Sequence, residues 1–466
     1  MNPEEIEVEA ARSGRRRIAA GVALALLVAV SSAGYGALAR SHRLFPYAIL
    51  SRRLHAHAQR HEERPGNDPI VRTAKIAKLA SLPYARGYRP ASAGAVIRAH
   101  EKSLADDGLN FFTSGHAPAA FLMDMDGRMI QSWTADAPKS FPGLTLGEDE
   151  RGRSIRRARL QSDGSILAMF EDVGLVHLDS ASRVLWSWRG PVHSDFAVGE
   201  DGRIWVLTRE TRTVPDLNHR GPVREDFLVE LTREGRFLRQ ISLIEGFRRS
   251  ACSPYLHVLP PGPEILETVS IQILDGTLAG RSRAFRAGNL LLSVKGLNAV
   301  GVLDPESGSI VWALSGQWYA QHSASLLRNN HLLLFDNLGS MREASRILEV
   351  DPFTQEILWA FGRQRGEELL SETGGFVQRL ENGNTLVIES NSGRVIEITP
   401  DHRVAWEFVN PNRVGKNGEL VATIPFMERV SRDFRSLGES GPGSSFRSTP
   451  RTRRAWSREK ASGAAG

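Results

Sequence analysis

The chain has 466 residues, 41% of them hydrophobic and 24% charged, which is typical of a folded protein and excludes a largely disordered one. Its formal net charge of +6 comes mainly from arginines near the two ends, so the composition does not indicate a nucleic-acid-binding protein. The single cysteine, Cys252, excludes an intrachain disulfide and any zinc site made of several cysteines.

The N-terminal region has the pattern of an export signal or a membrane anchor. A polar tail, residues 1–17, ends in three arginines and precedes an uncharged segment, residues 18–39, that is rich in Ala, Leu and Val. As a helix this segment would be about 33 Å long, enough to cross a bilayer core. The arginines favour a cytoplasmic N-terminus, so we expect a transmembrane helix with the rest of the chain outside the cytoplasm. The small-x-small sequence at residues 37–39 leaves a cleaved signal peptide open, which would also export the chain.

Residues 40–105 are expected to form a juxtamembrane connector. They include three closely spaced histidines, His55, His57 and His61. Because no carboxylate is arranged around these histidines, we interpret the segment as a solvated linker rather than a metal site.

From about Gly108 onward the chain repeats one phrase six times. Each copy has alternating apolar residues, an Asp or Thr, a turn, a few β-formers and usually a Trp, as in GVLDPESGSIVW, RILEVDPFTQEILW and RVIEITPDHRVAW. The Asp or Thr markers follow one another at intervals of 55, 53, 72, 47 and 48 residues: Asp124, Asp179, Thr232, Asp304, Asp351 and Thr399. A second phrase with an Asn-Gly or similar turn, such as QRLENGNTLVIES, has the form of a β-hairpin.

Two hairpin-like pairs per unit make a four-stranded sheet, so the repeats predict an all-β fold, a six-bladed β-propeller of four-stranded blades over residues 106–435. The repeated Trp residues are expected to fill the gaps between neighbouring sheets rather than to stack on a ligand. The β-rich run of residues 419–426 is expected to close the ring against an N-terminal strand. Residues 436–466 are rich in Gly, Ser, Pro and Arg and are predicted to be a disordered basic tail.

Candidate site residues are those that precede or end the innermost strands, where loops meet at one mouth of a propeller channel. His193 and His322 occupy equivalent points in two repeats, five residues before Val198 and Leu327. In the same register Glu267 leads into one inner strand and Lys295 ends the next, with Gln378 and Arg379 close to the mouth. Two imidazoles, a carboxylate and cationic groups suit an anionic substrate and nucleophilic or acid–base work by histidine. The alternative is that each histidine only bonds neighbouring loop carbonyls.

Five other histidines show no such register and are expected to be structural or solvent-exposed: His116, His177, His219, His257 and His331. The sequence contains no metal-ligand spacing, phosphate-binding loop or nucleophile elbow. It therefore predicts no metal and no organic cofactor.

Over roughly residues 108–413 the chain resembles the arylsulfotransferase family of exported bacterial six-bladed propellers. The resemblance is carried by GLNFFTSGHAPAAFLMDMDG, HSDFAVGEDG, LLLSVKGLNAVGVLDPESGSIVWALSGQWYAQH, LLLFDNLGS, SRILEVDP and QRLENGNTLVIES. It implies sulfuryl transfer from a phenolic sulfate ester to a phenol without a nucleotide donor, and a location on the outer side of a bacterial inner membrane, in the periplasm.

The resemblance also implies roles for the candidate residues. His322 would be the nucleophile that is transiently sulfurylated, and His193 would bind sulfate or protonate the leaving phenoxide. Related sequences commonly carry a histidine and an asparagine in the segment that here reads ILETVSI, with Glu267 and Val269, and an arginine where Lys295 stands. A lysine neutralises charge but lacks the bidentate fork of arginine.

Two other functions stay open at this stage. One is a membrane-tethered propeller that has lost the reaction and binds a protein or glycan partner. The other is a quinoprotein dehydrogenase, because DPESGSIVW resembles the tryptophan-docking repeats of those propellers, but six repeats are fewer than their usual eight.

Overall fold

The computed structural model describes residues 88–90, 96–145, 154–259, 262–339, 344–415 and 418–433. The chain divides into two compact units, Met1–Lys78 and Leu79–Gly466, and all described residues belong to the second. The tail 1–17, the segment 18–39 and the tail 436–466 lie outside the described residues, as does most of the connector. Within the described ranges no helix is both long and apolar enough to cross a membrane.

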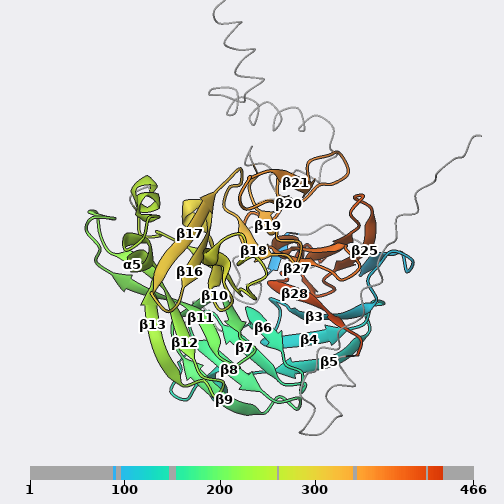
Figure 1. Ribbon diagram of the computed structural model, residues 1–466. Helices are drawn as coiled ribbons and strands as arrows, with labels where there is room; N and C mark the ends of the chain where they lie inside the picture. Colours follow the sequence, from blue (N-terminus) through green and yellow to red (C-terminus); the bar gives the residue numbers. More distant parts are fainter. Residues whose placement is uncertain are drawn as a thin grey trace, which may run out of the picture. The chain divides into compact units, whose positions relative to one another are not determined.

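Six antiparallel sheets follow one another along the chain and form the predicted six-bladed propeller (Figure 1). We number them blades 1–6. Blade 1 consists of β28 (Phe426–Ser431), β3 (Gly108–Thr113), β4 (Ala119–Met123) and β5 (Met129–Thr134). Blade 2 consists of β6 (Arg157–Leu160), β7 (Ile166–Phe170), β8 (Gly174–Leu178) and β9 (Val184–Arg189). Blade 3 consists of β10 (Val192–Val198), β11 (Ile204–Arg212), β12 (Val223–Leu231) and β13 (Phe237–Ser242).

The second half of the ring repeats this order of strands. Blade 4 consists of β14 (Thr268–Ile273), β15 (Leu290–Val294), β16 (Ala299–Asp304) and β17 (Ser309–Ser315). Blade 5 consists of β18 (His322–Leu326), β19 (Leu332–Asp336), β20 (Arg346–Val350) and β21 (Ile357–Phe361). Blade 6 consists of β22 (Phe376–Arg379), β23 (Thr385–Glu389), β24 (Arg394–Ile398), β25 (Val404–Val409) and β2 (Ile97–His100).

Short helices occur in the connections between these strands. They are α4 (Ala137–Ser140), α5 (Leu243–Arg248) and the 3₁₀ turns η3 (Ser253–Val258), η4 (Arg283–Phe285), η5 (Lys295–Leu297) and η6 (Ser390–Ser392). Both α5 and η3 lie in the connection between blades 3 and 4, which explains the long interval of 72 residues between two of the sequence repeats.

Two pairings join the ends of the propeller chain. The last strand, β28, runs antiparallel to β3 and is the innermost strand of blade 1, and β2 adds a fifth strand to the outside of blade 6. Residues 419–426 were expected to close the ring, but the closing strand begins only at Phe426. Leu420–Ala422 instead forms β27, which pairs with β1 (Tyr88–Pro90) and β26 (Arg413–Val414) in a separate three-stranded sheet. β28 thereby covers the edge of β3 that would otherwise be unpaired.

The second and third strands of the blades are almost wholly buried, as their Val-, Leu- and Ile-rich sequences require. Trp residues of the repeat connect neighbouring blades, as the sequence predicted. Trp133 donates to Gly164 O of blade 2, Trp359 donates to Pro400 O of blade 6, and Trp406 donates to Met125 O of blade 1. Each indole therefore satisfies its N–H on the next blade while its ring fills the gap between sheets.

Polar side chains also join the innermost strands at each of the six boundaries between neighbouring blades, which we call seams. Asp195 pairs with Arg157 of β6 at 2.8 Å and accepts from the backbone N–H of Ile271 in β14. The amides of Gln272 and Gln378 each bond both backbone groups of one residue in the next inner strand. The remaining seams are joined by Ser323 with Val377 and by Glu428 with Arg159. These contacts fix the inner strands, and so the loops at their ends, relative to one another.

Candidate active site

The four predicted site residues lie at one end of the strands, where the first strand of a blade begins and the second ends. His193 is near the start of β10, His322 is the first residue of β18, Glu267 directly precedes β14, and Lys295 directly follows β15. The blade topology thus brings all four to the same face of the propeller, from three consecutive blades.

A residue with positive φ lies in each of the three loops that carry His193, Glu267 and His322. Ser194 and Ser323, which directly follow the two histidines, have φ of 59° and 51°, and Glu267 itself has φ of 46°. A shift of strand register follows at each of these three places. Such bulges turn a side chain away from the direction that regular pleating would give it.

The register of the two histidines differs by one residue from the sequence expectation. Val198 pairs with Ile204, whereas the equivalent residue of blade 5 is Leu326, which pairs with Leu332. His322 therefore stands four residues before its counterpart of Val198, not five, because the bulge of β10 contains one residue more.

The hydrogen bonds of His322 determine which ring nitrogen carries the proton. Its Nδ1 lies 2.7 Å from Asn337 Oδ1 and 3.2 Å from Ala320 O, and a backbone carbonyl can only accept. Nδ1 is therefore the protonated nitrogen, and Nε2 carries the lone pair. Among the described residues no group hydrogen-bonds this Nε2.

The pKa of His322 is lowered to about 4. Burial is the largest cause, and the positive charges of Lys295 and Arg156 add to it, while the hydrogen bonds to Asn337 and Ala320 oppose it. The ring is thus neutral at ordinary pH. Arg156 directly precedes β6 of blade 2, which stands opposite blade 5 in a ring of six, so it approaches His322 from across the channel.

Lys295 and Glu267 form an ion pair, with Nζ and Oε1 2.9 Å apart. Both side chains keep partial exposure, 23% and 32%. Backbone bonds hold the two segments together as well, because Lys295 N donates to Glu267 O and Gly296 N donates to Leu266 O. The negative charge of Glu267 is therefore balanced by the positive charge of Lys295.

His193 differs from His322 in that its ring is enclosed. It is only 2% exposed. Its Nδ1 is 3.3 Å from Arg209 Nη2, and a guanidinium can only donate, so Nδ1 accepts and Nε2 carries the proton. That Nε2 lies 3.5 Å from Asp226 Oδ1. Burial lowers the pKa of His193, against the opposing effect of the Asp226 carboxylate.

Arg209 connects this buried pair to the rest of the site. Its Nε donates to Asp226 at 2.9 Å, and its Nη1 lies 3.6 Å from Glu264. Burial would lower the pKa of Arg209, but Asp226 outweighs it with help from Glu264 and Glu267, and the pKa is raised. The charge of Glu267 acts on Arg209, Glu267 is paired with Lys295, and the charge of Lys295 acts on His322, so the groups of this face influence one another electrostatically.

Sequence reasoning missed Arg156, Arg209, Asp226 and Asn337, and it misplaced one group. Arg379 pairs with Glu349 at 2.5 Å and bonds Gly383 O in the turn at the other end of β22, so it does not reach this mouth. Asn337 was visible in the repeat segment LLLFDN, but only the fold shows that it follows β19 and adjoins His322.

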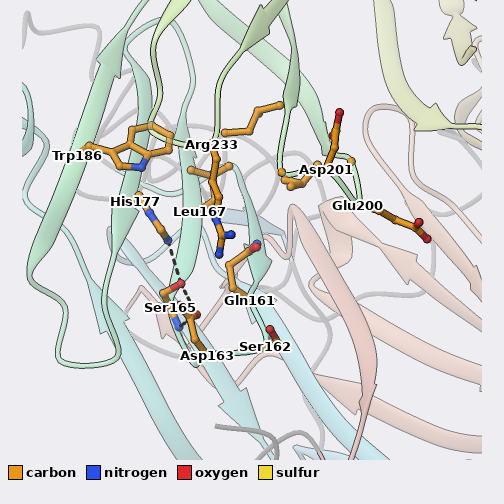
Figure 2. Close-up of a pocket in the computed structure, with 14 residues that line it drawn as sticks. Gln161, Ser162, Asp163, Ser165, Leu167, His177, Trp186, Glu200, Asp201 and Arg233 are labelled. Atoms are coloured by element: carbon orange, nitrogen blue, oxygen red, sulfur yellow. Dashed lines mark hydrogen bonds between the residues drawn. The ribbon is translucent and has the colours of Figure 1, made fainter. Parts of the chain in front are cut away.

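A pocket of about 240 Å³ lies at the opposite ends of the strands, between blades 2 and 3 (Figure 2). There His177 bonds Ser165 Oγ at 2.9 Å, and Ser165 in turn donates to Asp163 at 2.6 Å. The order of these bonds leaves the serine proton on the carboxylate side, so the imidazole does not activate the hydroxyl.

Comparison with known proteins identifies the class to which this fold and site belong. A family model described as Arylsulfotransferase (ASST) matches residues 160–411, which is more than half of the chain. The chain belongs to this family.

Solved structures similar to the chain include the following three proteins. A Bacteroides caccae protein of unknown function is 13% identical, with a TM-score of 0.44, over 70% of this chain and 99% of that chain. A streptogramin B lyase is 14% identical, with a TM-score of 0.40, over 75% and 95%. A virginiamycin B lyase from Staphylococcus aureus is 11% identical, with a TM-score of 0.34, over 59% and 83%. No curated protein matches the chain.

Proposed function

We propose that the protein transfers a sulfuryl group from an aryl sulfate ester to a phenol through a sulfohistidine formed on His322. The observation that carries this proposal is the state of the His322 ring. It is a neutral imidazole, protonated on Nδ1, whose Nε2 has no hydrogen-bond partner among the described residues and lies among positive charges. These are the properties that a histidine nucleophile for an anionic ester needs.

In the first half of the reaction, the Nε2 lone pair attacks the sulfur, the bond from sulfur to the donor's phenolic oxygen breaks, and the phenoxide leaves. In the second half, the oxygen of the acceptor phenol attacks the same sulfur, the N–S bond breaks, and the imidazole is restored. The proton lost by the acceptor balances the one gained by the first phenoxide. The net reaction needs no cofactor.

Lys295 and Arg156 are the groups proposed to bind the sulfate oxygens. Both are close enough to lower the pKa of His322, and they approach it from different blades. Negative charge develops on the oxygens of the transferred group, and fixed cations aimed at it lower the barrier. Arg156 thus offers a guanidinium at a site where position 295 carries lysine.

Glu267 is the carboxylate proposed to take the proton of the acceptor phenol. It lies at the mouth with a partly exposed side chain, 2.9 Å from Lys295 Nζ, and a carboxylate in this position can accept a proton from a phenol. His193 is proposed to act indirectly, because both of its nitrogens face protein groups. It accepts from Arg209 and so helps to hold that guanidinium between Asp226 and Glu264.

The experiment that tests this function uses the full chain with a chromogenic aryl sulfate and a phenol. We expect turnover, and mass spectrometry of the intact protein exposed to donor alone should show one added sulfo group on histidine. His322→Ala should abolish both. His402→Ala is the matched control, since His402 bonds Glu367 in an outer region of the propeller. Equal turnover by the His322 variant would refute the assignment of the nucleophile.

The second candidate is a propeller that has lost the reaction and binds a protein or glycan. One observation favours it: the Lys295 ammonium is already paired with Glu267, which reduces the positive charge offered to a sulfate. Absence of both turnover and adduct in the folded wild-type protein, with a partner retained in pull-downs from membranes, would favour this function instead.

A further inference from the structure

We propose that Asn337 is a positioning residue that fixes the protonation pattern of His322 and so makes its Nε2 the reactive atom. The proposal rests on the proposed function for its consequence in catalysis, but the hydrogen-bond pattern can be measured without any activity. It concerns a residue that does not touch the substrate.

The orientation of the Asn337 amide follows from its own partners. Its Nδ2 lies 2.7 Å from Ser371 O and 2.5 Å from Gly374 O. Because backbone carbonyls only accept, the NH₂ group must face them, and the oxygen of the amide must face His322. The reversed amide would place Oδ1 against two carbonyl oxygens and an N–H against the ring, which costs several hydrogen bonds at once.

The two anchoring carbonyls belong to the segment that leads into blade 6, whereas His322 and Asn337 belong to blade 5. Ser345 ties the same segment down, since its Oγ donates to Asn337 O and accepts from Ser371 N. Asn337, Ser345 and Ser371 are all fully buried. The amide is therefore shielded from bulk solvent and held on both sides by described groups.

The contacts between blades 5 and 6 therefore determine which nitrogen of the His322 ring carries the proton. In a free histidine both neutral forms exist, and the bond made by one nitrogen decides which form is present. With Asn337 in place, Nδ1–H has a fixed acceptor at 2.7 Å, and the lone pair stays on Nε2. Without Asn337, the only described acceptor that remains is Ala320 O at 3.2 Å.

The decisive measurement is the ¹⁵N NMR spectrum of His322 in the resting wild-type protein at pH 7, assigned by comparison with His322→Gln. We expect Nδ1 to be protonated and Nε2 to be unprotonated. In Asn337→Ala we expect a mixture of both forms and a rate of His322 sulfurylation that falls by about 100-fold or more, by analogy with loss of the group that orients a catalytic histidine. A wild-type ring protonated on Nε2 would overturn the proposal.

A second variant and a control separate positioning from simple loss of structure. In Asn337→Asp one carboxyl oxygen faces the carbonyls of Ser371 and Gly374, so we expect this buried carboxyl to be protonated and to donate to them, while its other oxygen still accepts from Nδ1–H and keeps the wild-type NMR pattern. Asn410→Ala is the control: Asn410 is equally buried and donates to Ala422 O and Ser114 Oγ, but it has no contact with His322. An Asn337→Asp spectrum that shows the same mixture of forms as Asn337→Ala would contradict the proposal.

The result also distinguishes this proposal from the proposed function. If the NMR pattern is as expected and changes in Asn337→Ala, but no sulfo adduct ever forms, then the positioning holds and the sulfuryl-transfer function fails. If the adduct forms and neither its rate nor the NMR pattern responds to Asn337, then the function holds and the positioning fails.

Discussion

Acidification should destabilise the native protein through His322, and replacing this residue should remove the effect. Histidine in an unfolded chain has a pKa near 6.5, whereas that of His322 in the native protein is about 4. Because the native pKa is the lower one, the unfolded chain binds the proton more tightly. The free energy of unfolding therefore falls as the pH is lowered through 6.5, and the loss is complete below pH 4.

The size of the loss follows from the difference between the two pKa values. Each unit corresponds to about 1.4 kcal/mol, so the full effect of His322 is about 3 kcal/mol, and about half of it is reached near pH 5.5. This figure is an upper limit, since the ring keeps some contact with solvent. It is nevertheless a large share of the roughly 5–15 kcal/mol by which a folded protein is stable.

Urea unfolding of the wild type and of His322→Gln at pH 8, 5.5 and 4.5 measures this effect. The difference between the two proteins at pH 8 contains the packing cost of the substitution, so it is subtracted from the differences at lower pH. We expect the wild type to lose roughly 1–2 kcal/mol more than the variant between pH 8 and 5.5. Parallel pH dependences for the two proteins would refute the burial of a neutral imidazole at this position.

Four other predictions concern the site and the ring. Lys295→Ala should lower kcat with an aryl sulfate by about 100- to 1000-fold, since it removes one cation aimed at the transferred group; an unchanged kcat in steady-state assays would count against that role. Glu267→Gln frees the Lys295 ammonium and removes the proton acceptor, so KM for the donor should fall while acceptor-dependent desulfurylation slows by about 100-fold in single-turnover experiments. Asp195→Ala leaves the buried Arg157 without its carboxylate and should cost about 3–5 kcal/mol in urea unfolding, far more than an exposed ion pair would. Deleting residues 426–466 removes β28, and we expect loss of the cooperative unfolding transition, because the β3 edge is then open.

The architecture could be predicted from the sequence because each blade of a propeller repeats the same pattern of strands and turns. Six copies of one phrase determine the number of blades, and the Trp positions determine how neighbouring blades dock, as Trp133 and Trp406 show. The ring closure was harder to predict. Residues 419–426 and Phe426–Ser431 are both β-rich, and only pairing across the whole chain distinguishes β27, the central strand of the separate three-stranded sheet, from the closing strand β28.

The candidate site was predictable only in part, for a similar reason. His193 and His322 were found because the repeat places them at equivalent points of two blades. What the repeat does not contain is the orientation of each ring, which depends on groups from other strands: Arg209 for one ring and Asn337 for the other. Two histidines that look alike in sequence therefore differ in the structure: His193 is 2% exposed, with Nε2 3.5 Å from Asp226, whereas the His322 ring keeps some contact with solvent.

The charge balance of this mouth explains how a carboxylate can stand in a site for anions. Lys295 is paired with Glu267, Arg209 with Asp226 and Glu264, and Arg156 lies 3.8 Å from Glu171, so attraction of a sulfate ester must come from the placement of the cations rather than from excess positive charge. A neutral nucleophile fits this balance, because a protonated His322 would attract the ester but could not attack it. Burial lowers the pKa of His322, so the ring loses a positive charge that would attract the ester but keeps the lone pair that attacks it. The cations Lys295 and Arg156 then attract the transferred group mainly in the transition state, where negative charge develops on its oxygens.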